Sequence, residues 1–381
     1  MVIYFAILLI CICCSFSSKL ASNNRLRHFL VFLLALFFCF GYMTGSDWRN
    51  YETYYSWLSL PDGINSLTFE PGYKYLSLLF HAIGLPFWPF FIALKLVAFY
   101  VVIHFLGKYS SGNKLLFLCM TFFLFVFGLY FFIDNPMRNL LAICISYYAY
   151  KYLENREMLK ASLLILLAAF FHISAVCLFL LIPFYPIKSS NKRIFIAFLL
   201  FNILIMSFYE FLVLKIIGSF SFIPLIESKM ILYFLDGEGL ENNSLISLGF
   251  IIQFIFLLLV LYKRKEMEKL PSGKLIFWGT ISYIFLYRIA AIVDIFYRIQ
   301  LYMAVFYCIG VCFVLFAFVR RNNKIVYATF LSCYLFYMTY ALVTSSTKYV
   351  PYSSYISYMF SPELPFEYRS EYNPQNSPYA E

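Results

Sequence analysis

Residues 115–133 read LLFLCMTFFLFVFGLYFFI, and no side chain in this stretch is charged. About 20 such residues cross the hydrocarbon core of a bilayer as an α-helix. Similar runs are VIYFAILLICICCSF at 2–16, FLVFLLALFFCFGYM at 29–43 and SLLILLAAFFHISAVCLFLLI at 162–182. Their apolar residues are continuous and do not alternate, which argues against the strands of a membrane barrel. The sequence therefore predicts an all-α, polytopic integral membrane bundle.

The composition supports the same class. Of the 381 residues, 63% are hydrophobic and 13% are charged, against roughly 25% charged in soluble domains. The net charge of +10 is spread over short loops, such as Lys263–Lys265 and Arg320–Arg321, which is a topology signal and not a nucleic-acid surface. The ten cysteines lie in apolar runs, where they behave as small hydrophobes and favour neither a disulfide nor a metal site.

We expect about 11–13 transmembrane helices. Candidate spans lie near 2–16, 29–45, 86–106, 115–133, 138–153, 161–184, 193–209, 245–262, 275–293, 298–318 and 325–343. The stretches 70–84 and 209–225 are ambiguous and leave room for re-entrant segments. The first span has no basic residue before it and basic residues after it, which indicates a retained helix with its N-terminus outside.

The spans form one predicted transmembrane domain, residues 1–344. Two polar intervals, near 46–70 and 226–244, are expected to be external loops over a cavity. Residues 345–381 are rich in Tyr, Pro and Ser and show no helical periodicity. This tail is predicted to be interfacial and then disordered.

Ionisable groups in or beside a span cost several kcal/mol unless they have partners, so each is a functional candidate. The stretch DWRNYETYY at 47–55 carries Asp47, Arg49, Tyr51 and Tyr54. Aromatic faces stack on sugars, and carboxylates accept hydrogen bonds from hydroxyl groups. An interfacial aromatic belt with a helix cap at Asp47 is the alternative interpretation.

Two further candidates flank predicted helices. Glu70 precedes Pro71, at a helix start where the dipole favours negative charge, so capping alone could also explain it. Arg138 lies in the first turn of a long apolar helix, where a cation is unfavourable without a nearby anion. That anion could be Asp134, a lipid head group or a substrate pyrophosphate.

The remaining candidates lie deeper in the sequence. His172 falls near the middle of the span at 161–184, where its ring must face protein or water; a plain interhelical hydrogen bond is the alternative. Arg288, Asp294 and Arg298 belong to a late helix. Asp294 and Arg298, at i and i+4, have the spacing of an ion pair on one helical face. Such a pair would account for Asp294 structurally but would leave one of the two arginines unexplained.

Motifs of soluble enzymes are missing from the sequence. We find no P-loop, HExxH, GxSxG, nucleotide fingerprint or metal-spaced Cys/His cluster. We therefore expect no cofactor, and a membrane-bound substrate that is already activated.

The order DWRNYETYY, FEPGYKYL, PMRNLLAICI, AAFFHISA and an arginine-rich late helix resembles the EpsG family of bacterial polysaccharide-biosynthesis proteins, related in role to Wzy O-antigen polymerases. The resemblance covers most of residues 40–300. It implies an inverting, metal-independent glycosyltransferase of the bacterial cytoplasmic (inner) membrane. Its substrate would be an oligosaccharide on undecaprenyl diphosphate, polymerised at the outer face for capsule, lipopolysaccharide or another surface polysaccharide. A flippase and a chain-length regulator would be its partners, and nucleic acid would not.

This resemblance and the residue chemistry suggest roles for the candidates. Cations suit the diphosphate, and a sugar hydroxyl needs a base. The expected diphosphate ligands are Arg138, Arg288 and Arg298, with Asp294 beside them. His172 is the expected base or hydrogen-bond orienter, and the expected glycan contacts are Asp47, Arg49, Tyr51, Tyr54 and Glu70, of which Asp47 or Glu70 could equally be the base. A transporter or flippase, an O-antigen ligase and a membrane acyltransferase are the competing functions.

A shared site requires Asp47, Arg138, Arg288 and Arg298 to open on the external side. This arrangement holds if residues 70–84 do not cross the membrane while 193–209 and 209–225 both do. It leaves Lys188–Arg193 outside, as an exception to the rule that basic loops face the cytoplasm. In the rival topology 70–84 crosses and Arg138 faces inward. Loop charges do not decide between them; we favour the first because it gathers the cations around one cavity.

Overall fold

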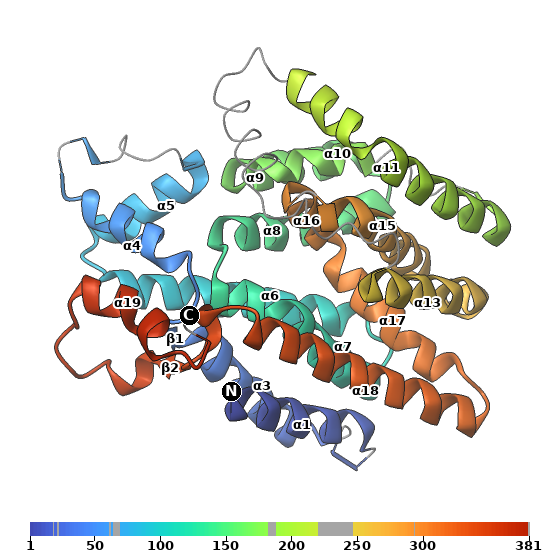
Figure 1. Ribbon diagram of the computed structural model, residues 1–381, viewed down its shortest axis with the longest axis horizontal. Helices are drawn as coiled ribbons and strands as arrows, with labels where there is room; N and C mark the ends of the chain where they lie inside the picture. The colour runs from blue at the N-terminus through green and yellow to red at the C-terminus, as the bar shows by residue number, and fades with distance from the viewer. Residues whose placement is uncertain are drawn as a thin grey trace.

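The computed structural model is a bundle of apolar helices (Figure 1). Among the described residues, six helical segments are long and apolar enough to cross a membrane. They are α6 (Phe87–Tyr109), α7 (Asn113–Phe123) with its continuation η2 (Leu124–Asp134), the first part of α11 (Asn191–Ser219), α15 (Gly273–Ile292) and α18 (Arg321–Thr344). The sixth is the segment Phe296–Ala317, which comprises most of α16 (Asp294–Gln300), the 3₁₀ turn η6 (Leu301–Met303) and α17 (Ala304–Ala317). Shorter apolar helices are α1 (Val2–Phe16), α9 (Met158–Phe171) and α13 (Leu248–Tyr262). The prediction of an all-α, polytopic membrane bundle is confirmed.

The structure describes residues 1–17, 19–20, 23–60, 62–63, 69–181, 188–219, 247–292 and 294–379, with the backbone alone at 181, 209–219, 294 and 295. The predicted loop near 226–244 and part of the loop at 46–70 lie outside these ranges, as do residues 220–225 of the ambiguous stretch.

The centre of the bundle is formed by α7, η2 and α17, whose side chains are almost all buried. Around them pack α1, α3 (Asn24–Cys39), α6, α15 and α18. Helix α8 (Met137–Glu154) packs against α6 and α9. Aromatic rings fill this core, as in the stacked pair of Tyr283 and Tyr307, whose centroids are 3.9 Å apart. These helices are apolar on every face. Their lengths therefore predicted that they cross the membrane, but their sequences did not predict which of them lie at the centre of the bundle.

One end of the bundle carries a layer of short elements (Figure 1). It contains α4 (Trp48–Trp57), α5 (Pro71–Ala82) and α19 (Phe366–Asn376). Two-residue strands, β1 (Gly41–Tyr42) and β2 (Ser353–Ser354), pair antiparallel there. Helix α4 is amphipathic and buries Trp48, Tyr51, Glu52, Tyr54 and Tyr55, so it lies flat against the layer beneath it.

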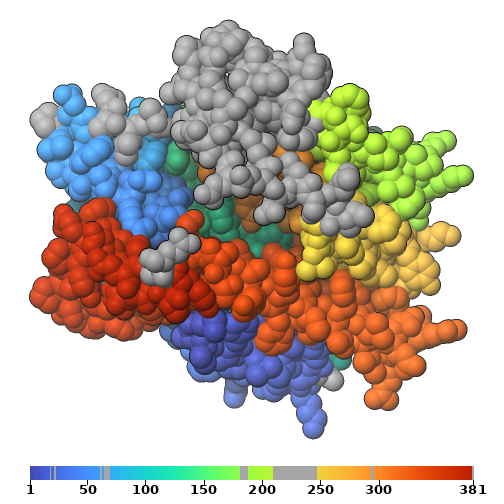
Figure 2. Space-filling view, in the orientation of Figure 1, coloured from blue at the N-terminus to red at the C-terminus, as the bar shows by residue number. Residues whose placement is uncertain are grey.

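The prediction of a disordered tail is wrong. After α18 the chain forms the β2 pairing and helix α19, and the red C-terminal segment covers this end of the molecule beside the blue α4 and α5 (Figure 2). Arg369 and Asn373 of α19 are buried. The tail is ordered because its polar groups bond to distant residues, as in the hydrogen bond from Arg369 Nη1 to the Glu52 carboxylate at 2.7 Å.

Most of the basic side chains lie at the end of the bundle opposite α4, α5 and α19. Hydrogen bonds join Arg27 to Asn113, Ser272 to Glu154, and Arg264 to the Ser189 carbonyl, so the adjoining helix ends lie together. Basic residues at or next to these ends are Arg25, Arg27, Lys108, Lys114, Lys151, Lys160, Lys192, Arg193, Lys263, Arg264, Lys265, Lys274, Arg320, Arg321 and Lys324. By the positive-inside rule we expect this end to be cytoplasmic and the end with α4, α5 and α19 to be external, and the two ends are named accordingly below.

The predicted span at 161–184 is broken. Helix α9 ends at Phe171, and after His172 the chain continues as the 3₁₀ turn η3 (Ile173–Cys177) and α10 (Leu178–Leu181). Ser189 is again at the cytoplasmic end, beside Arg264. The segment therefore reaches the external half at His172 and turns back. Lys188–Arg193 belong with the other cytoplasmic cations, and the expected exception disappears.

Helix α5 stays at the external end. Glu70 at its start pairs with Arg138, and Leu85 just beyond its end accepts a hydrogen bond from Tyr55 of α4 at 2.7 Å. Twelve residues span about 18 Å as a helix, less than the hydrocarbon thickness of roughly 30 Å. This agrees with the topology in which 70–84 does not cross.

Candidate active site

A polar cavity of about 180 Å³ opens at the external end, between the layer of short helices and the bundle. Its walls are formed by Asp47, Asn50, Tyr51, Phe69, Pro136, Arg138, Asn139, His172 and Arg298. Five of the ten candidate residues from the sequence line it: Asp47, Tyr51, Arg138, His172 and Arg298. These residues come from α4, α8, the α9–η3 break and α16, which are far apart in the chain.

The position of Asp47 at the cavity depends on a close backbone approach at Gly45. Gly45 has φ +82°, and a Cβ there would lie 1.9 Å from the Ile133 carbonyl oxygen. Only glycine lets the link before α4 approach the end of η2 so closely. Ser46 then donates hydrogen bonds to the Asp134 carboxylate from its backbone N–H at 3.0 Å and its hydroxyl at 2.6 Å. Asp47 is thereby fixed beside the chain that leads into α8.

The wall with Arg138 follows from a sharp turn. The π-helix η2 (Leu124–Asp134) ends at Asn135, which is left-handed at φ 70°. Its side-chain amide donates to the carbonyls of Ile133 and Thr44, which stabilises this conformation. Pro136 follows, and Arg138 falls in the first turn of α8. π-Helical geometry is rare in proteins, and where it occurs it often marks a functional site.

Arg138 is compensated by Glu70. The two side chains form an ion pair, and the guanidinium lies 4.3 Å from the centroid of the Phe69 ring. The backbone N–H of Arg138 donates to the Tyr51 hydroxyl at 3.3 Å. Asp134, one of the anions considered for Arg138, instead pairs with Lys348 at 3.4 Å. The unfavourable cation at a helix start therefore has a protein partner at the cavity wall.

The two carboxylates near the cavity differ in basicity. Burial acts to raise the pKa of Glu70, but Arg138 and His172 outweigh it and hold that pKa below its usual value. Burial and the neighbouring Asp134 raise the pKa of Asp47 to about 6. Since a general base is most effective with a pKa near the working pH, Asp47 is the better suited of the two to accept a proton.

His172 does not lie in the middle of a helix, as the sequence predicted, but at the break after α9. Its Nδ1 accepts the Ser174 backbone N–H at 3.3 Å and lies 2.7 Å from the Ser174 hydroxyl. That hydroxyl also bonds to Tyr302 and Asn139. Because Nδ1 is an acceptor, the neutral ring carries its proton on Nε2. His172 is therefore set to donate a hydrogen bond at the cavity wall.

The other candidates lie elsewhere. Arg288 packs over Phe250 at 4.2 Å and bonds to Asn202 at 3.3 Å, away from the cavity lining. Arg49 donates to the carbonyls of Gly45 and Ser370, which ties α4 to the tail. Tyr54 is buried against Phe69. The side chain of Asp294 lies outside the described residues, and so does its expected ion pair with Arg298.

Comparison with protein families places this site in context. The family model of EpsG matches residues 24–354, nearly the whole chain. The chain belongs to the EpsG family. This EpsG-family protein is accordingly a multi-pass membrane protein of polysaccharide biosynthesis. No curated protein and no solved structure matches it.

Several residues in or next to the cavity of this EpsG-family protein were not predicted from the sequence. Asn139 follows Arg138 directly, and Asn50 lies one residue before Tyr51, so proximity to a charged or aromatic candidate was the available signal. Tyr302 is four residues after Arg298 and supports His172 through Ser174. An i, i+4 search around each intramembrane arginine would have found it.

Proposed function

We propose that this EpsG-family protein is a glycosyltransferase that polymerises lipid-linked oligosaccharides. It transfers the growing glycan from undecaprenyl diphosphate to the next lipid-linked repeat unit at the outer face of the bacterial cytoplasmic membrane. The observation that carries this proposal is the external cavity, where two arginines, a carboxylate of raised pKa and a hydrogen-bond donor converge. The family and the multi-pass architecture agree with a lipid-linked substrate.

In this proposal the arginines receive the leaving group. Guanidinium groups stay charged and bind phosphate oxygens in pairs. Arg138 and Arg298 line the same cavity, so they can neutralise the charge that develops on the diphosphate as its bond to the sugar breaks. Glu70 holds the Arg138 guanidinium at the wall before substrate arrives.

The base in this proposal is Asp47. The acceptor hydroxyl oxygen attacks the anomeric carbon and its proton passes to the Asp47 carboxylate, while the electron pair of the glycosidic bond leaves with the diphosphate. Attack from the face opposite the leaving group inverts the anomeric centre. Asn50, Tyr51 and Phe69 line the space between these groups, and their amide and rings suit a sugar. Positive charge comes from the protein, so the proposed reaction is metal-independent.

A deletion strain tests this function against its competitors. Loss of a polymerase leaves surface glycan of one repeat unit. Loss of a flippase leaves no exported unit, and loss of a ligase leaves polymer on the carrier lipid. Loss of an acyltransferase changes modification but not length. We expect single units after deletion and a restored chain-length ladder after complementation with the wild-type protein; any of the other three phenotypes would overturn the proposal.

A further inference from the structure

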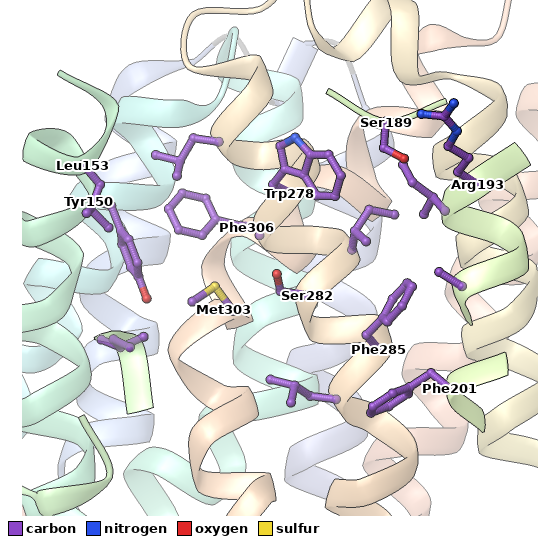
Figure 3. Close-up of a pocket in the computed structure, with 17 residues that line it drawn as sticks. Tyr150, Leu153, Ser189, Arg193, Phe201, Trp278, Ser282, Phe285, Met303 and Phe306 are labelled. Carbon is purple, nitrogen blue, oxygen red and sulfur yellow. The ribbon is translucent and has the colours of Figure 1, made fainter. Parts of the chain in front are cut away.

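A second cavity, of about 650 Å³, lies in the cytoplasmic half of the bundle (Figure 3). Its lining comes from α8, α10, α11, α15, η6 (Leu301–Met303) and α17 and is mostly aliphatic and aromatic. Ser282 and Phe306 face the space in the close-up, and Ser189 and Arg193 stand together at one end of it (Figure 3). None of these residues has a part in the glycan chemistry proposed above.

We propose that this cavity binds an anionic phospholipid of the cytoplasmic leaflet, with an acyl chain among the apolar side chains and the phosphate on Arg193. The volume falls within the roughly 300–1,000 Å³ of ligand pockets. Basic pockets between transmembrane helices on the cytoplasmic side suit anionic lipid head groups. This inference does not depend on the proposed polymerase activity.

Arg193 has the features of a head-group ligand. It lies in the first turn of α11, is exposed, and forms no ion pair with any residue that the structure describes. Trp278, also in the lining, has its ring centroid 5.9 Å from the guanidinium of Arg264, which bonds to the Ser189 carbonyl, and tryptophan prefers the membrane–water interface. The charged group is thus at the water-facing end and the apolar volume is at the depth of acyl chains.

The position argues against the isoprenoid chain of the proposed substrate as the occupant. Arg138 at the external site and Leu153 in this lining are on the same helix, fifteen residues apart. That separation is about 22 Å along the axis. A phosphate on Arg193 therefore belongs to the opposite leaflet from a diphosphate on Arg138.

Native mass spectrometry of the full-length protein in detergent tests the site, with phosphatidylglycerol and phosphatidylcholine of identical chains as probes. We expect the wild type to retain phosphatidylglycerol about fivefold better than phosphatidylcholine, because both lipids carry a phosphate but the choline cation of the second offsets its charge and weakens the attraction to Arg193. Arg193→Gln should abolish this preference. Arg321→Gln, which removes an exposed cation from the same end but not from the cavity, should retain it.

A second variant tests the apolar half of the site. Ser282→Phe fills the cavity and should weaken the retention of both phospholipids. Equal retention of phosphatidylglycerol by wild type and Arg193→Gln would overturn the proposal. So would a co-purified lipid whose mass is that of undecaprenyl phosphate or diphosphate and which Ser282→Phe displaces, since the isoprenoid chain would then be the occupant.

Discussion

Two glutamate–arginine pairs at the external end have the same chemistry but different surroundings. Glu70 and Arg138 have side chains 16% and 21% exposed, and Arg138 lines the cavity. Glu52 and Arg369 are 11% and 5% exposed, are joined by two 2.7 Å hydrogen bonds, and lie outside the cavity lining. Each arginine also lies over an aromatic ring. The first pair is open to a ligand, and the second is closed within the protein.

The pKa values show what this difference means. Burial raises the pKa of Glu52 to about 7, although the hydrogen bonds and charge of Arg369 oppose the shift. Glu70, in contrast, has a lowered pKa. A buried pair contributes little net stability but is costly to break, because one charge is then left uncompensated. The Glu52–Arg369 pair therefore holds α19 against α4, while the Glu70–Arg138 pair presents a cation to the cavity.

The largest expected effect on activity is that of Arg138→Ala. It should lower polymerisation by about 10³-fold, because the diphosphate loses a positioned donor, while the thermal unfolding midpoint changes little. Arg138→Lys should recover only part of the activity, since an ammonium group cannot bind two phosphate oxygens in a fork. Gel analysis of surface glycan in a complemented deletion strain measures both variants. A wild-type ladder from Arg138→Ala would refute the assignment.

Arg369→Ala should act through stability instead. It leaves Glu52 buried without its partner, which we expect to cost about 3–5 kcal/mol and to release α19 from α4. Thermal unfolding in detergent and protease cleavage of the C-terminal helix report this change. Glu363→Gln is the matched control, because Glu363 is 61% exposed and 3.5 Å from Arg369, and it should be nearly silent. Unchanged protease resistance in Arg369→Ala would show that the pair does not hold the tail.

His172 should contribute less than Arg138. His172→Ala removes one donor to the charged transition state and should slow polymerisation by about 10- to 150-fold. His172→Gln keeps an N–H donor and should retain more activity than His172→Ala. Rates from the purified protein separate the two variants. Equal and complete loss in both would indicate proton transfer by the ring, and wild-type rates in both would make His172 structural.

The smallest expected effect is on pH dependence. A base must be deprotonated, so with a pKa of about 6 for Asp47 the rate should fall about tenfold per pH unit below pH 6 and level off above it. Lys348 lowers the pKa of Asp47, so Lys348→Met should move this acid limb to higher pH. A limb that stays in place in Lys348→Met, or that is absent near pH 6, would assign the base to another group.

The sequence predicted the helices well because uncharged runs of about 20 residues have few alternatives in a membrane protein. It did not predict the break at His172, because Phe171 and Ile173 continue the apolar run and the capping contact to Ser174 leaves no hydropathy signal. Helix α19 was missed because Arg369 owes its burial to Glu52, 317 residues away. Local pattern holds no information about such a contact.

The candidate site could be predicted from the sequence where a charged residue stands at an electrostatically unfavourable position. Arg138 at a helix start required an anion, and the structure supplies Glu70. Arg288 and Arg298 appeared equivalent because both are arginines of the late apolar region. Arg288 packs over Phe250 and bonds to Asn202, whereas Arg298 lines the cavity. Sequence spacing could not separate them, because it does not show which other helices each side chain meets.

We propose that the external cavity with Asp47, Arg138, His172 and Arg298 is a polymerase active site. The most direct test is to reconstitute the purified protein in liposomes with lipid-linked repeat units and to follow chain length on gels. We predict that the wild-type protein alone produces a ladder and that Arg138→Ala, equally folded, leaves single units. Movement of units across the bilayer without any growth, or an undiminished ladder from Arg138→Ala, would show that the cavity is not a polymerase active site.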